Sequence, residues 1–217
     1  MKKIVVPYIE NLGSMSAQEL SQTLERFGAR DLIDCAPWAE FPYKPDVSFE
    51  LAADDSYLFV KYNVNGLGLR AEFERLNEPV WQDSCVEIFV ADPDGGGYRN
   101  FEVNCIGTML SSHQRGRGID VVPISEEAAK SVKRFTSKHG RVFPEQDGEH
   151  EWTVVVGIPF ELLGYRQRPD ELRANLYKCA DASSRPHYLC WSPISTAKPD
   201  FHRPEFFGTL ILEPKKQ

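Results

Sequence analysis

The stretch Val80-Trp81-Gln82-Asp83-Ser84-Cys85-Val86-Glu87-Ile88-Phe89-Val90 decides the fold. Its second half is rich in β-branched and apolar residues and follows a turn-forming Asp-Ser pair, which predicts a β-strand. Side chains alternate along a strand, so Val86, Ile88 and Val90 should share one face and Cys85, Glu87 and Phe89 the other. A carboxylate among apolar neighbours is costly unless it is paired or faces a ligand. Glu87 is therefore the first candidate for function.

Most of the remaining chain also reads as short strands bounded by Gly, Pro, Asn or Asp. The predicted strands cover residues 47–51, 57–64, 69–73, 85–90, 101–110, 152–158, 174–180, 187–191 and 208–212. Many short strands with little helix between them favour a sandwich over a parallel α/β sheet. We predict an all-β protein, an antiparallel jelly-roll-like β-sandwich.

One short helix is predicted near the N-terminus. Ser16 and Glu19 form a capping-box pattern, and Leu20, Leu24 and Phe27 then recur at helical spacing before a glycine. No linker or repeat interrupts the chain. Residues 1–217 are therefore expected to form a single domain, with residues 1–45 as an N-terminal extension whose helix packs on the sandwich.

The stretch from residue 112 to 148 is polar, charged and glycine-containing, which predicts a long inserted loop. A short helix is expected within it over residues 126–134. A further strand is expected to begin at residues 134–136, with Val142 and Phe143 on its far side.

The net charge of the chain limits the classes of partner that it is expected to bind. The sequence has 217 residues and a net charge of −7 at pH 7. An acidic surface argues against nucleic acid and anionic membranes as main partners. The apolar run at residues 4–6 is too short for a signal peptide, and no stretch is long enough to span a membrane. We expect a cytoplasmic protein.

Five cysteines occur, at positions 35, 85, 105, 179 and 190, and none forms a Cys-x-x-Cys pair. An odd number of cysteines in apolar runs predicts reduced, mostly buried thiols. Zinc sites usually take ligands at tighter local spacing, so none is predicted. The loop at residues 92–94 could hold calcium but lacks EF-hand spacing, and we predict no cofactor.

A second carboxylate, Glu102, is predicted close to Glu87. Glu102 and Asn104 share one face of the next strand, and the glycine-rich loop at residues 92–97 could join the two strands as a hairpin. Paired carboxylates can hydrolyse glycosides or accept hydrogen bonds from sugar hydroxyls. They can also pair with a nearby cation such as Lys61, Arg70 or Lys178, as in a structural or interaction domain. The residues alone leave these three interpretations open.

Two aromatic residues, Trp81 and Phe201, lie in loops beside strand ends. Exposed aromatic faces there can pack on the C–H faces of sugar rings. Trp152 and Trp191 lie within strand-like runs and are expected in the core. His202, next to Phe201, could bind a hydroxyl or an anion. Known nucleophile, phosphate-loop and zinc-protease motifs are absent.

Five segments, in order, resemble the family 9 carbohydrate-binding modules and their relatives in the DOMON-like sandwich group. They are Pro79-Val80-Trp81 through Phe89, Tyr98-Arg99-Asn100-Phe101-Glu102-Val103-Asn104, Trp152 through Phe160, Ala174-Asn175-Leu176 with Trp191-Ser192-Pro193, and Pro204-Glu205-Phe206-Phe207-Gly208. This resemblance implies a sandwich that binds glycans without cleaving them. In the better-known members two tryptophans clamp a sugar ring at the reducing end of a chain.

The resemblance also implies roles for particular residues. Trp81 matches the first clamping tryptophan, and Glu87 matches a glutamate that contacts sugar. Phe201 stands where the second tryptophan is expected, and Glu102 where a sugar-binding arginine is expected. The calcium ligands of the family and the haem ligands of its relatives have no matching residues here.

The resulting hypothesis is non-catalytic binding of a mono- or oligosaccharide. The predicted ligand-binding residues are Trp81, Glu87, Glu102, Asn104, Phe201, His202, Lys178 and Arg70. The alternatives are a glycoside hydrolase that uses Glu87 and Glu102, and an interaction domain without a sugar ligand.

Overall fold

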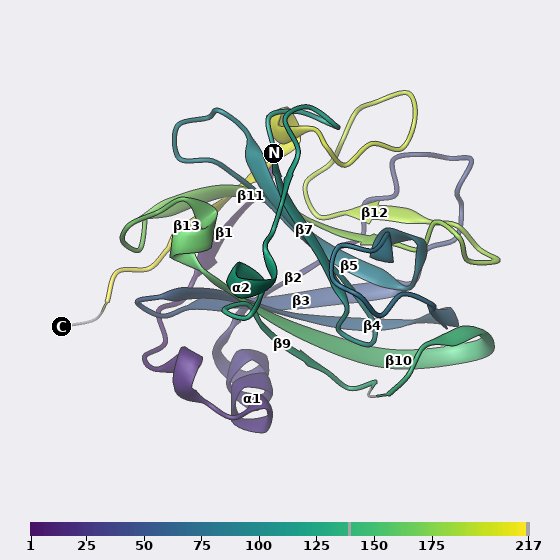
Figure 1. Cartoon of the computed structure of the whole chain (residues 1–217), viewed down its shortest axis with the longest axis horizontal. Coiled ribbons are helices and arrows are strands. Elements are labelled where there is room, and N and C mark those ends of the chain that lie inside the picture. The colour runs from purple at the N-terminus through teal and green to yellow at the C-terminus, as the bar shows by residue number, and fades with distance from the viewer. Residues whose placement is uncertain (139, 216–217) are drawn as a thin grey trace.

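Two β-sheets pack face to face in the computed structural model, which describes residues 1–138 and 140–215 (Figure 1). The larger sheet has the order β1 (Lys3–Val6), β13 (Gly208–Leu212), β11 (Glu171–Cys179), β5 (Cys85–Ala91), β6 (Tyr98–Asn104), β7 (Met109–Gln114) and β8 (Val122–Pro123), and β12 (Tyr188–Cys190) also pairs with β11. The smaller sheet has the order β2 (Ala29–Leu32), β3 (Asp46–Ala53), β4 (Tyr57–Ala71), β10 (Phe143–Pro159) and β9 (Lys133–Thr136). Only the pair β1–β13 is parallel among the strands described. The predicted antiparallel β-sandwich is confirmed.

The main core fills the space between the two sheets. Val86, Ile88 and Val90 of β5 lie in it and are at most 1% exposed, together with residues of β4 and β10 such as Val60 and Val154. The predicted alternation of β5 is confirmed, because its other face points away from this core. A period of two thus places every second residue of the strand on one side of the sheet.

A second apolar cluster covers the outer face of the larger sheet. It combines strand residues such as Phe89, Tyr98 and Tyr177 with Trp38 and Phe207, which come from connecting segments. Strand β5 and the part of β11 from Ala174 to Cys179 are therefore buried on both faces. Polar side chains on the outer face of these segments lie under the connecting segments rather than in open solvent.

Helix α1 (Ala17–Phe27) packs on the outer side of the smaller sheet (Figure 1). Its capping box is present: the Ser16 hydroxyl accepts from the Glu19 amide, and the Glu19 carboxylate accepts from the Ser16 amide. Leu20 and Leu24 are fully buried against Phe59. Phe27, predicted on the same face, is 56% exposed, so that part of the prediction was wrong.

The sequence between residues 101 and 148 is more ordered than predicted. The single strand expected over residues 101–110 is a hairpin, β6 and β7, because Asn104 and Thr108 close a turn around Gly107, whose φ is 91°. The expected loop contains β8, helix α2 (Glu126–Ala129) and β9. Helix α2 ends earlier than predicted because Lys133–Thr136 forms strand β9, which pairs with β10. The strand predicted to begin at residues 134–136 is therefore present.

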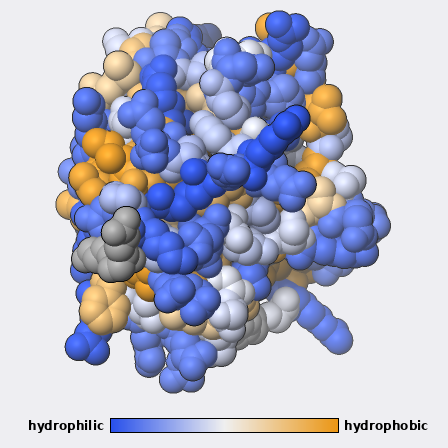
Figure 2. Space-filling model, turned by 90° about the vertical axis from the view of Figure 1, so that its left-hand side faces the viewer, coloured by the Kyte–Doolittle hydropathy of each residue, from blue (hydrophilic) through white to orange (hydrophobic). Residues whose placement is uncertain are grey.

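Four short 3₁₀ helices complete the described elements: η1 (Leu12–Ser14), η2 (Val80–Gln82), η3 (Phe160–Leu163) and η4 (Pro204–Phe206). The face of the molecule in Figure 2 is mostly hydrophilic, with apolar residues in small separate groups. Among the described residues no helix has the length and apolar character needed to cross a membrane.

We expect Leu24→Ala to lower the free energy of unfolding by about 2–5 kcal/mol, because it leaves a cavity between α1 and the smaller sheet. Phe27→Ala on the same helix should change it by less than about 0.5 kcal/mol, since the ring is mostly exposed. Urea unfolding followed by tryptophan fluorescence measures both. Equal effects of the two substitutions would contradict the burial of Leu24 between α1 and the smaller sheet.

Candidate functional site

A cavity of about 590 Å³ lies over the outer face of the larger sheet. Its floor includes Glu87 of β5, Glu102 of β6 and Cys179 at the end of β11. Trp81 and Phe201 line the same cavity from opposite parts of the chain. The structure therefore brings together Trp81, Glu87, Glu102, Phe201 and His202 among the predicted site residues.

Glu87 and Glu102 face each other directly across β5 and β6 and are 3% and 4% exposed. Among the residues that the structure describes, neither carboxyl forms an ion pair. Burial raises the pKa of Glu102 to about 7 and that of Glu87 well above its usual value. A third carboxyl, Asp181, lies in the wall of the cavity, and burial raises its pKa to about 6. The floor is thus rich in carboxyl groups that resist ionisation.

The two facing carboxyls have different partners. Glu102 Oε1 accepts a hydrogen bond of 2.6 Å from the Asn100 amide, whereas Glu102 Oε2 is buried without a partner in the described part of the chain. Glu87 Oε1 lies 2.9 Å from the Cys179 thiol. An unpaired buried oxygen is costly, so the lining of this cavity leaves one acceptor that a ligand could satisfy.

A chain of polar side chains connects Glu102 to the far wall. The side-chain oxygen of Asn100 accepts from the Ser112 hydroxyl at 2.7 Å. The side-chain amide of Gln114 donates to the same hydroxyl at 2.9 Å. Beyond it, the Tyr98 hydroxyl lies 2.8 Å from His202 Nδ1. Burial lowers the pKa of His202 to about 4, so the ring is neutral at pH 7 and shares one hydrogen bond with the Tyr98 hydroxyl.

Trp81 is held at the rim of the cavity by its backbone. Its carbonyl accepts from the Asp181 amide at 3.2 Å, and the neighbouring Gln82 carbonyl accepts from Ala182 at 3.1 Å. These bonds fasten η2 to the segment that follows β11. The residue is 37% exposed, so it offers apolar surface to a ligand.

Phe201 forms part of the wall rather than a free platform. It is 8% exposed, and its ring stacks on Tyr177 with centroids 4.2 Å apart and planes 11° apart. The Tyr177 hydroxyl also donates to the Phe201 carbonyl at 3.1 Å. A clamp of two equally exposed rings is therefore not what this cavity offers, because Trp81 supplies most of the accessible aromatic surface.

The segment that carries Phe201 and His202 leaves the sheet between β12 and β13. Both strands pair with the same edge of β11, β13 over Glu171–Ala174 and β12 over Tyr177–Cys179. At the gap, the Asn175 amide donates to the Ser192 carbonyl at 2.9 Å, and the Asn175 side-chain oxygen accepts from the Ser192 amide at 2.8 Å. The Asn175 side chain thus takes the place of a backbone hydrogen-bonded pair along this edge of β11. It fixes where the segment carrying Phe201 and His202 begins.

Asn104 does not reach the cavity, although it was predicted there. Its amide donates to the Phe73 carbonyl and to Asp83, both at 2.9 Å, and its side-chain oxygen accepts from Thr108. Asp83 in turn is fully buried and accepts from the backbone of Glu72. The Asn104 side chain is thus fully used in fastening two turns.

Arg70 and Lys178 also lie outside the cavity. Arg70 makes a two-fold hydrogen bond with Glu72 and a 3.5 Å ion pair with Asp83. Lys178 lies opposite Val86, so its side chain points between the sheets, where it donates to His187 at 2.9 Å. Neither cation pairs with Glu87 or Glu102, and neither does Lys61, which pairs with Glu25.

Several residues that complete the cavity were not predicted from the sequence. Phe41 and Tyr188 form an edge-to-face pair at 4.8 Å in its wall, and Arg117 and Val121 line it from the segment between β7 and β8. Asp181 was also missed. Except for Tyr188, the first residue of β12, these residues come from connecting segments, where no periodic pattern predicts which side chains turn inward.

A second cavity, of about 580 Å³, lies over the smaller sheet. Exposed charges of both signs line it, including Arg30, Asp34, Lys44 and Glu151. It contains neither of the facing carboxyls and no exposed aromatic ring, so the cavity over the larger sheet is the stronger candidate.

Together the fold and this cavity define a ligand-binding β-sandwich. The chain belongs to carbohydrate-binding family 9, whose family model matches residues 20–212. It is similar to a protein from Bacteroides uniformis to which carbohydrate binding has been ascribed, with 33% identity, a TM-score of 0.92 and coverage of 98% of this chain and 99% of that one. None of the curated proteins compared with the chain matches it.

The fold is also that of a family 9 carbohydrate-binding module from Caldicellulosiruptor kristjanssonii. The module solved with cellotriose has 14% identity and a TM-score of 0.61, and covers 99% of this chain and 95% of that one. The module solved with glucose has the same identity and a TM-score of 0.59, over 99% and 97% of the two chains.

We expect Glu102→Gln to stabilise the protein increasingly as the pH rises from about 4.5 to 7. Because the folded-state pKa exceeds the usual value of 4.5, folding favours the protonated carboxyl, and the stability it contributes at low pH is lost as the pH rises through about 7. The gap between variant and wild type should approach the order of 3 kcal/mol. Urea unfolding across this pH range measures it.

The matched control is Glu40→Gln, which removes an exposed carboxyl from another segment. Its unfolding curve should follow that of the wild type at every pH. A Glu102→Gln curve that also runs parallel to the wild type would contradict the burial of this carboxyl.

Proposed function

We propose that the cavity over the larger sheet binds a mono- or oligosaccharide without cleaving it. The observation that carries this proposal is the partly exposed Trp81 ring beside a buried floor of carboxyl and amide groups. Sugars present flat C–H faces that pack on aromatic rings, and hydroxyls that need polar partners. Membership of carbohydrate-binding family 9 supports the same conclusion.

The floor suits hydroxyl groups because it can both donate and accept hydrogen bonds. Burial raises the pKa of Glu87 and of Glu102, and a carboxyl in its protonated form has one O–H donor and free acceptor positions. Glu102 Oε2 has no protein partner among the described residues and could bond directly to a sugar hydroxyl. The related modules were solved with cellotriose and glucose, so glucose-based sugars are the first ligands to test.

We expect Trp81→Ala to weaken sugar binding by roughly 30-fold, which corresponds to about 2 kcal/mol for a central aromatic contact. Isothermal titration with glucose, cellotriose and a panel of other mono- and oligosaccharides measures the affinity. Phe27→Ala, which removes an exposed ring on α1, should bind as the wild type does. If no sugar in the panel binds the wild-type protein, the proposed function is wrong.

We further propose that Glu87 and Glu102 bind rather than hydrolyse. In glycosidases the two carboxyls flank the scissile bond, and one of them must be ionised. Here they lie side by side on one face of the sheet, and burial opposes the ionisation of both. This arrangement favours a binding surface.

Aryl-glycosides incubated with the wild-type protein should therefore release no more phenol than the buffer does. Glu87→Gln serves as the matched variant. Hydrolysis by the wild type that disappears in this variant would show that the protein is a glycosidase.

A further inference from the structure

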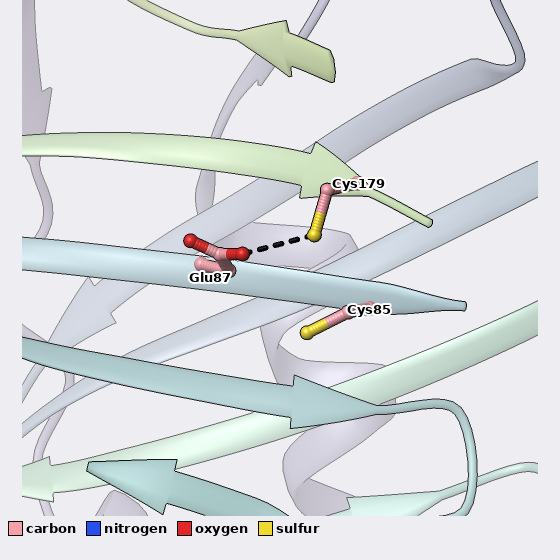
Figure 3. A group of neighbouring side chains, drawn as sticks. All are labelled: Cys85, Glu87 and Cys179. Atoms are coloured by element: carbon pink, nitrogen blue, oxygen red, sulfur yellow. Dashed lines mark hydrogen bonds between the residues drawn. The ribbon is translucent and has the colours of Figure 1, made fainter. Parts of the chain in front are cut away.

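Two thiols and one carboxyl converge beneath the cavity. The Sγ atoms of Cys85 and Cys179 and a carboxyl oxygen of Glu87 all lie within 4.8 Å of one another. Figure 3 shows Glu87 and Cys179 pointing toward each other from the neighbouring strands β5 and β11, with Cys85 beside them. Cys85 and Cys179 are partners in the strand register, and alternation places Glu87 on the same face. The backbone of the sheet therefore fixes all three groups.

The surroundings of this cluster have an excess of acidic groups. Glu102 lies directly across from Glu87, and its buried Oε2 has no protein partner in the described part of the chain. The Lys178 ammonium is held on the opposite side of the sheet by the Cys179 carbonyl and His187. Among the described residues neither Glu87 nor Glu102 forms an ion pair, so the cluster is short of positive charge.

We propose that Cys85, Cys179 and Glu87 bind a zinc ion. Two sulfur ligands and one carboxylate suit Zn²⁺ and exclude calcium, which takes six to eight oxygen ligands. Zinc–sulfur bonds of about 2.3 Å in a tetrahedron separate the ligand atoms by roughly 3.5–4 Å. The observed separations are within small side-chain adjustments of this geometry.

Protons are released and negative charge is partly offset when the ion binds. Zn²⁺ displaces the protons of both thiols and of the Glu87 carboxyl, and these leave to solvent. The two positive charges of the ion then offset two of the three negative charges of its ligands. Cys179 and Glu87 line the cavity, so the fourth coordination position faces it and is open to water or to a hydroxyl of a bound molecule.

The test is a titration of the full chain with CdCl₂ and ZnCl₂ after removal of metal with EDTA, in a phosphine reductant that keeps the thiols free. Cadmium should produce thiolate charge-transfer absorption that saturates at one ion per chain, and zinc should displace it. Cys85→Ser should abolish this absorption. Glu87→Gln, which keeps both thiols, should weaken cadmium binding by about tenfold or more.

The double variant Cys35→Ser/Cys190→Ser is the matched control, because these residues form the other facing pair of thiols in the fold. It should bind cadmium as the wild type does. Loss of the absorption in this variant, or its persistence in folded Cys85→Ser, would overturn the proposal, as would a wild-type protein that gives no absorption. The readout is independent of sugar binding, so this proposal and the proposed function can fail separately.

Discussion

The burial of β5 on both of its faces is the constraint on which the rest of the structure depends. One face supplies the core between the sheets, and the other lies under aromatic residues of the connecting segments. A strand in the middle of a sheet with both faces covered has no exposed position for a charged group. Glu87 and its partner Glu102 must therefore exchange water for a few fixed contacts, which raises the pKa of both carboxyls. The same burial brings two thiols into line with a carboxyl beneath a cavity.

Much of the fold could be predicted because its signals are local. The period-2 pattern of β5 assigns its two faces, and a short turn at residues 92–97 aligns β6 with it, which places Glu102 opposite Glu87. The capping box that begins α1 lies within four residues of sequence. Where a local signal was ambiguous, tertiary contacts decided: the apolar stretch at residues 101–110 turns at Gly107, and Phe27 remains in solvent.

The rest of the site depends on contacts between distant parts of the chain. Whether Lys178 faces the cavity or the core follows from its register with Val86, which no sequence pattern reveals. The sequence pattern predicts Asn104 as a ligand-binding residue, but its side-chain amide is bonded to Asp83 in a turn from another part of the chain. Cys85 and Cys179 are far apart in the sequence, so spacing rules for metal ligands could not connect them. Phe41 and Asp181 enter the cavity from segments without periodic structure.

The side-chain bridge from Asn175 to Ser192 has a consequence for how this scaffold can change. Because β12 and β13 both hold the same edge of β11, the segment between them is anchored at its two ends and contributes no strand of its own. Its length and composition can vary without shifting the register of the sheet. Relatives can thus acquire different ligand preferences by exchanging one cavity wall, and a designer could graft a new wall at the same two anchor points while the core between the sheets stays intact.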